Sequence, residues 1–205
     1  MAYRNYIAAL VLGVFSFSAN AMLIDRGGGY IYDDVLDITW TQNANNNGLA
    51  IWADQVAWAE SFSLFDSARN VTWDDWRLPS VDVNDDDIIV DCSSAPELTC
   101  RDNEYGYLFH QYGITRFEPG IFTNFSPARY WSGTVFASDP GDAWAFDFDF
   151  SGVATSIKNT NSGVVFAVRP GDVGVVPIPA TAWLFGSALG LLGWMRRKSI
   201  SVSIE

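Results

Sequence analysis

The chain has 205 residues and a formal net charge of −12 at neutral pH, set by 24 acidic and 12 basic side chains. All of the acidic residues except Glu205, and eight of the basic residues, lie between Met22 and Val176. The basic residues of that span are scattered singly, so they form no patch that could displace counterions from nucleic acid or anionic polysaccharide. We therefore expect no nucleic-acid partner.

The first 21 residues have the pattern of a secretory signal peptide. Arg4 supplies the positive charge, Ile7 to Phe17 form a short apolar stretch, and Ala19-Asn20-Ala21 fits the small-residue cleavage pattern. A plain N-terminal membrane helix would need a longer apolar stretch. We expect cleavage after Ala21, which leaves residues 22–174 as one ectodomain large enough for a hydrophobic core.

The ectodomain opens with a predicted hairpin, a short strand and a helix. The triplet Gly27-Gly28-Gly29 marks a turn before Tyr30-Ile31-Tyr32, and Val35 to Trp40 indicates a second short strand. Residues 49–65 predict a helix, because apolar side chains recur there at helical spacing: Trp52, Val56, Ala59 and Phe62. Its polar sides would carry Asp54, Gln55 and Glu60. Tryptophans can stack on sugars, but on a helix they more often belong to the core.

Two arginines stand beside prolines in apolar surroundings, Arg77 before Leu78-Pro79 and Arg169 before Pro170. A buried guanidinium without a carboxylate partner would be very costly. We therefore expect both arginines to be structural, and the candidate partners are Asp74, Asp75 and Glu104.

Residues 81–101 form a polar insertion that is rich in carboxylates: Asp82, Asp85, Asp86, Asp87 and Asp91. Carboxylates this close repel one another unless a cation or solvent screens them. Asp82, Asn84 and Asp86 have the 1-3-5 spacing of a calcium loop, but Asp87 and Ser93 replace the turn glycine and the closing glutamate of an EF-hand. Two interpretations stay open: a looser calcium site on these aspartates, or a solvated acidic loop.

The chain contains two cysteines, Cys92 and Cys100, and one histidine, His110. In an exported protein the cysteines are expected to form a disulfide that closes a short loop. A zinc site is disfavoured because zinc takes four ligands. His110 falls in a second predicted helix, residues 104–112, without a recognisable Ser or Cys nucleophile, so we expect no catalytic dyad.

The last third of the ectodomain is predicted to be β-rich. Residues 129–136, 143–150, 153–158 and 164–169 indicate four strands separated by glycine-containing turns. The alternation over 143–150 predicts a core face made of Trp144, Phe146, Phe148 and Phe150. Asp147 and Asp149 would share the opposite face about 7 Å apart. That geometry suits a cation or a sugar hydroxyl, and equally a solvated face.

Three motifs in order resemble the Lcl C-terminal domain family over roughly Leu23 to Asp172: Trp76-Arg77-Leu78-Pro79, Tyr130-Trp131-Ser132-Gly133-Thr134 and Phe166-Ala167-Val168-Arg169-Pro170-Gly171. The resemblance implies an α+β domain similar to C-type-lectin-like folds, in which two helices pack on a twisted antiparallel sheet. It carries no identified ligand with it.

The end of the chain predicts a sorting signal with a membrane anchor. A proline motif, Val176-Pro177-Ile178-Pro179, precedes the uncharged run 180–195 and a basic cluster, Arg196-Arg197-Lys198. The run is short for a span, which usually takes about 20 residues. The order of these parts resembles the PEP-CTERM tail of Gram-negative bacteria, although that family's motif is Pro-Glu-Pro.

The resemblance of residues 175–198 implies a transmembrane helix and a sorting protease of the exosortase type. The positive-inside rule places the basic end and residues 199–205 in the cytoplasm. The expected location is the cell surface or extracellular matrix, after export through the inner membrane. Families with this tail are commonly linked to extracellular polysaccharide.

Two functions of different classes follow. The first is a non-catalytic surface or matrix protein with lectin-like binding of carbohydrate or another extracellular ligand. The second is an extracellular enzyme, such as a carboxylate-based glycoside hydrolase, because so many acidic residues always offer some pair. We favour the non-catalytic interpretation, with calcium as a cofactor that the acidic loop could hold.

Overall fold

The computed structural model describes residues 22–150 and 152–174. The predicted signal peptide, residues 1–21, and the predicted sorting tail, residues 175–205, lie outside the described residues. Within the described part, nine strands and three short helices make a mixed α+β domain with antiparallel strand pairing. None of these helices is long and apolar enough to cross a bilayer.

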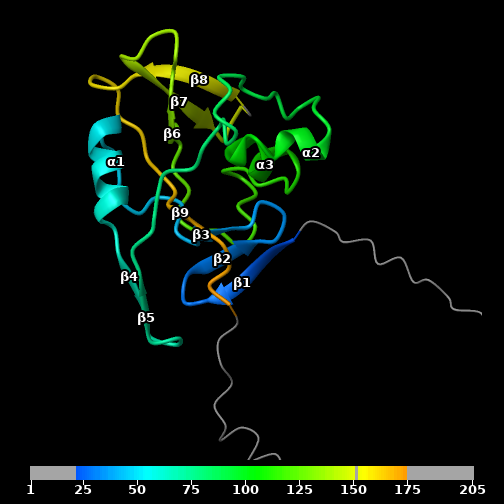
Figure 1. Ribbon diagram of the computed structural model, residues 1–205, viewed down its shortest axis with the longest axis vertical. Helices are drawn as coiled ribbons and strands as arrows, with labels where there is room; N and C mark the ends of the chain where they lie inside the picture. The colour runs from blue at the N-terminus through cyan, green and yellow to red at the C-terminus, as the bar shows by residue number, and fades with distance from the viewer. Residues whose placement is uncertain (1–21, 151, 175–205) are drawn as a thin grey trace, which may run out of the picture.

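Four strands form the sheet in the lower part of Figure 1, in the order β1-β2-β3-β9. β1 (Leu23–Gly27) and β2 (Tyr30–Asp33) make the predicted hairpin, because Gly28 and Gly29 take positive φ angles that glycine adopts without strain. β3 (Ile38–Thr41) pairs with β2, and β9 (Val168–Pro170) pairs with β3. The first and last of the described strands thus lie in one sheet, at its two edges.

A three-stranded sheet lies at the opposite end of the molecule (Figure 1). It contains β6 (Tyr130–Val135), β7 (Asp142–Asp147) and β8 (Gly152–Ile157) in that order. α1 (Trp52–Ser61) stands on one side of the domain, and α3 (Glu104–His110) stands on the other side. α3 is close to the predicted helix, and Asn103 caps it by accepting the N–H of Gly106 at 2.8 Å.

Several predicted elements are shorter than the sequence indicated. Within the described residues the strands divide among three sheets, whereas one twisted sheet was predicted. α1 ends at Ser61, and the following residues form β4 (Leu64–Asp66), which pairs with β5 (Val71–Trp73). The Asp66 carboxylate accepts two backbone N–H groups of the next residues and so makes the turn between these strands. The polar insertion contains a short helix, α2 (Glu97–Cys100), that was not predicted.

The main core fills the space between the two larger sheets and is mostly aromatic: Trp40, Tyr105, Tyr130, Phe146, Phe148 and Phe166 are almost fully buried. Many of these rings meet edge to face, for example Tyr130 and Phe148, whose centroids are 5.0 Å apart. Such pairs contribute about 0.5–1.5 kcal/mol beyond the area they bury. The core therefore holds the strands that carry the loops described below.

The alternation predicted over residues 143–150 holds only as far as β7. Asp147 ends the strand, because its carboxylate accepts the N–H of Asp149 at 2.8 Å and turns the chain. Phe148 returns to the core after this turn, but Phe150 is 81% exposed. The prediction that Phe150 belongs to the core is therefore wrong.

Candidate functional site

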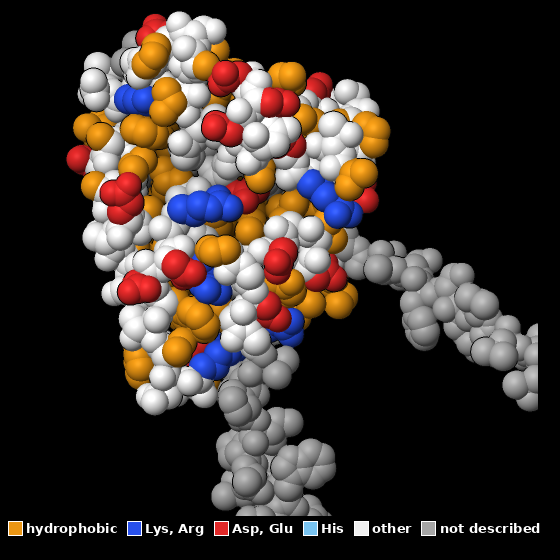
Figure 2. Space-filling model, viewed as in Figure 1, with side chains coloured by type: hydrophobic (Ala, Val, Ile, Leu, Met, Phe, Trp, Pro, Cys, Tyr) orange, Lys and Arg blue, Asp and Glu red, His pale blue; other side chains and the backbone are white. Residues whose placement is uncertain are grey.

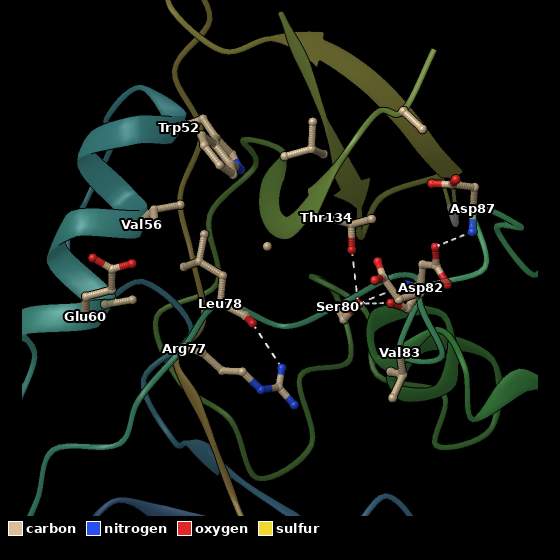
Figure 3. A pocket seen from close by; sticks show the side chains of 15 residues that line it. Trp52, Val56, Glu60, Arg77, Leu78, Ser80, Asp82, Val83, Asp87 and Thr134 are labelled. Carbon is tan, nitrogen blue, oxygen red and sulfur yellow. Dashed lines mark hydrogen bonds between the residues drawn. The ribbon is translucent and has the colours of Figure 1, made fainter. Parts of the chain in front are cut away.

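A cleft of about 670 Å³ opens between α1, the C-terminal half of β6 and the acidic loop that follows Pro79. It is lined by Trp52, Val56, Ala59, Glu60, Arg77, Leu78, Ser80, Asp82, Val83, Asp85, Asp87, Gly133, Thr134, Val135 and Ala137. In Figure 3, Trp52, Val56 and Glu60 lie on one side, and Asp82 and Asp87 lie on the other side. The size is that of a small-molecule or oligosaccharide site.

The α1 wall is held in place by a buried glutamine. Gln55 is fully buried, and its amide nitrogen donates to the carbonyl oxygens of Gly48 and Gly163, both at 2.8 Å. A buried amide without partners would be costly, so these bonds fix the start of α1 on the β-rich half. The prediction that Gln55 lies on a polar side of the helix is therefore wrong.

Trp52 stands at the rim of the cleft in a fixed orientation. Its indole N–H donates to the carbonyl oxygen of Ser132 on β6 at 2.8 Å. The ammonium of Lys158 lies 4.2 Å from the centroid of the ring and donates to the carbonyl oxygen of Pro140. The ring is half-buried, unlike a core tryptophan such as Trp40. It therefore offers an aromatic platform that needs little ordering when a ligand binds.

The facing wall is the acidic loop, which we define as residues 81–87. Asp82 is 6% exposed, and its two carboxylate oxygens accept the N–H groups of Asp86 at 3.2 Å and Asp87 at 2.9 Å. Asp102 accepts two further N–H groups of the loop, those of Val83 and Asn84. One aspartate of the loop and one that follows it in the chain thus stabilise the loop.

Side-chain bonds also attach the acidic loop to β6 and α3. The Ser80 hydroxyl lies 3.0 Å from the Thr134 hydroxyl, and the Thr134 hydroxyl accepts the N–H of Val81. The Glu104 carboxylate accepts from the Arg77 guanidinium at 2.9 and 2.6 Å and from the Ser80 N–H at 2.7 Å. Burial acts to lower the pKa of Arg77, but the hydrogen bonds and charge of Glu104 outweigh it and raise the pKa.

Both arginines pair with predicted carboxylate partners. Arg77 pairs with Glu104, and Arg169 pairs with Asp75 through two bonds of 2.7 and 2.9 Å. The bond to Arg169 lowers the pKa of Asp75. Arg77 therefore brings little uncompensated positive charge into the cleft, although its side chain is 43% exposed.

Three carboxylates at the cleft accept no hydrogen bond from the described part of the chain: Glu60, Asp85 and Asp87. Asp85 and Asp87 have φ angles of 59° and 64°, a left-handed conformation that Asp and Asn tolerate better than most residues. Figure 2 shows acidic side chains on the α1 side and on the loop side of the cleft. The free carboxylates can accept hydroxyl or ammonium donors from a ligand.

The structure brings together two of the five aspartates that were predicted to share a calcium ion, Asp82 and Asp86. Asp82, Asp85 and Asp87 line the main cleft, Asp86 lines a second cavity behind it, and Asp91 lines a third beside the disulfide. Asp82 and Asp86 approach Asp102, with one oxygen of each within 4.8 Å of the others. These three could hold a cation, but no observation tests it, so calcium stays a prediction. Asp102 was not among the predicted ligands, because it approaches Asp82 and Asp86 only through the fold of the loop.

The other candidate residues lie away from the cleft. Asp149 pairs with Arg116 at 2.5 Å, so the predicted open pair with Asp147 does not form. Cys92 and Cys100 form the predicted disulfide, under which α3 packs. His110 ends α3 at the third cavity.

The chain matches a family of known proteins. The sequence pattern of the Lcl C-terminal domain matches residues 29–169. The match covers more than half of the chain, from the turn before β2 into β9. No curated protein matches the chain. The chain therefore belongs to the Lcl C-terminal domain family.

Proposed function

We propose that this protein is an exported, non-catalytic binding protein that holds a carbohydrate in the cleft between α1 and the acidic loop. One observation carries the proposal: an oriented, half-buried Trp52 faces carboxylates that accept no bond from the described chain. A sugar ring presents an apolar face to an aromatic side chain and hydroxyl donors at its edges. Carboxylates accept such hydroxyls in strong hydrogen bonds. The cleft matches both requirements.

The rest of the proposal concerns where the protein acts. The signal pattern of residues 1–21 and the PEP-CTERM-like tail support export and a transient anchor in the membrane of a Gram-negative bacterium. An exosortase-type protease would then release the domain to the cell surface or matrix. The disulfide fits an oxidising compartment. A C-type-lectin-like relationship agrees with a binding role, as an analogy of fold alone.

The alternative is a glycoside hydrolase on the same cleft. Such an enzyme uses one carboxyl group as a general acid, with a raised pKa. The carboxylates available at the cleft, Glu60, Asp85 and Asp87, are exposed, whereas such an acid is typically held in an apolar pocket. We therefore propose binding rather than hydrolysis.

A glycan array tests the proposal with the full chain, purified in a detergent that contains no sugar. We expect glycan binding that Trp52→Ala reduces by about tenfold or more, because truncating an aromatic anchor of a binding site costs about 2 kcal/mol or more. Trp144→Ala is the matched control, because Trp144 is also half-buried but lies on β7 outside the cleft. Thermal unfolding monitors folding of both variants, and Trp52→Phe keeps the stacking ring if Trp52→Ala unfolds. Equal binding by all variants would place the ligand elsewhere.

A further inference from the structure

The charge of the cleft narrows the class of sugar. We infer that the ligand is a glycan with free, protonated amino groups, such as a hexosamine polymer, rather than a neutral or acidic glycan. This inference rests on the proposed function, because it assigns a ligand class to the same cleft. It follows from which charges line the cleft, which of them are already paired, and where they stand relative to Trp52.

The charged side chains that line the cleft are mostly acidic. The lining contains four carboxylates, those of Glu60, Asp82, Asp85 and Asp87, and a single cation, Arg77. Arg77 is compensated by Glu104, so the carboxylates dominate the potential inside the cleft. An opposite charge is attracted more strongly in such a partly closed site than in open water. A sulfated or uronic glycan would be repelled.

One of these four carboxylates stabilises the loop, and the other three are available to bind a ligand. Asp82 uses both oxygens to hold the acidic loop. Asp85 and Asp87 face the cleft from that loop without a protein donor among the described residues, and Glu60 does so from α1. A neutral hydroxyl could bond to any of them, but an ammonium donates up to three bonds and also neutralises the charge. Charge complementarity therefore favours the amine.

Lys158 and the acidic loop together set the orientation of the ligand in the cleft. Lys158 places its ammonium over the Trp52 ring, 4.2 Å from the centroid, so one face of the ring is covered by a positive charge. An amino group of the ligand would be repelled there and attracted to the loop wall, where Asp85 and Asp87 stand. The apolar face of a sugar ring would lie against Trp52, and its amine would point to the opposite wall.

Three tetrasaccharides with the same β-1,4 backbone test the inference: glucosamine, N-acetylglucosamine and glucose oligomers, which differ only at C2. The full chain is titrated in sugar-free detergent, in mildly acidic buffer with a calcium chelator. We expect the glucosamine oligomer to bind about tenfold or more tightly than the other two. Its advantage should shrink as ionic strength rises from about 0.01 to 0.15 M, where the Debye length falls from about 30 to 8 Å.

Variants identify the carboxylates involved. Asp85→Asn/Asp87→Asn should abolish the preference for glucosamine, and the amide suits the left-handed backbone at both positions. Asp74→Asn/Asp54→Asn is the control, because it removes the same charge from two exposed aspartates outside the cleft lining. An unchanged preference in the double variant of the loop would overturn the inference.

The remaining outcomes separate this inference from the proposed function. Equal binding of all three oligomers, weakened by Trp52→Ala, would retain carbohydrate binding and refute the amine. Tetralysine binding as tightly as the glucosamine oligomer would assign the cleft to cationic peptides. A requirement for calcium would show that a metal, not the ligand's ammonium, contacts the carboxylates. No binding of any oligomer would refute both proposals.

Discussion

Two Arg–Glu pairs with the same shortest bond length but different burial allow a test of what holds the cleft together. Glu104 accepts from Arg77 and from the Ser80 N–H, and its shortest bond to Arg77 is 2.6 Å. Glu97 accepts from Arg101 and from the Tyr107 hydroxyl, and its shortest bond to Arg101 is also 2.6 Å. The Glu104 side chain is 3% exposed, whereas that of Glu97 is 48% exposed.

Glu104→Gln should lower the free energy of unfolding by about 2–3 kcal/mol. The amide presents a donor to the Arg77 donors, and a lost bond to a charged group costs about 1.5–3 kcal/mol. Breaking a fully buried pair costs about 3–5 kcal/mol, but Arg77 is 43% exposed and water can solvate part of its charge. Glu97→Gln should cost less than about 1 kcal/mol, because exposed pairs contribute little.

Urea and thermal unfolding, followed by tryptophan fluorescence, measure both changes. For a domain of this size about 1 kcal/mol corresponds to about 2–4 °C in melting temperature. Glu104→Gln should therefore lower the melting temperature by about 4–12 °C, and Glu97→Gln by less than about 4 °C. Equal losses would show that burial does not set the contribution of these pairs, and the reasoning would be refuted.

Two further predictions concern stability away from the cleft. Replacing both cysteines by serine should cost about 2.5 kcal/mol, because Cys92 and Cys100 are only eight positions apart and close a short loop; unchanged urea unfolding would contradict this. Burial raises the pKa of Asp33 above 3.8, although Leu36 N–H and the Tyr112 hydroxyl favour the charged form. The folded state then binds this proton more tightly than the unfolded state does. Protonated Asp33 therefore adds to the free energy of unfolding at low pH, and this contribution is lost as pH rises through the raised pKa. Asp33→Asn should therefore remove this part of the pH dependence when the free energy of unfolding is measured in urea at a series of pH values. The same pH dependence in the variant and the original protein would refute this prediction.

The predictions that succeeded depended on strong local or chemical requirements. Positive φ angles at Gly28 and Gly29 made the first hairpin predictable, because few other residues adopt them readily. Arg77 and Arg169 needed carboxylates, and the choice of partners was small. The chain has two cysteines, so one intramolecular pairing was open to them, and the structure shows it.

The predictions that failed extended a periodic pattern past the residue that ends it. α1 ends at Ser61, because Phe62 takes an extended conformation. Asp147 accepts the N–H group two residues ahead and turns the chain, so β7 ends there. Phe150 is exposed for this reason. Gln55 is buried because its amide donates to the carbonyl groups of Gly48 and of Gly163, which is 108 positions away, and periodicity carries no record of such contacts.

The acidic loop shows why composition alone could not define the site. Its aspartates look equivalent in the sequence, and crowding suggested that one cation should gather them. In the fold, Asp82 and Asp102 turn inward and bind backbone N–H groups, which lets the loop exist without neutralising every charge. That internal bonding holds Asp85 and Asp87 in a left-handed conformation at the wall of the cleft. The same run of residues thus supplies both the support of the wall and the charges that face a ligand.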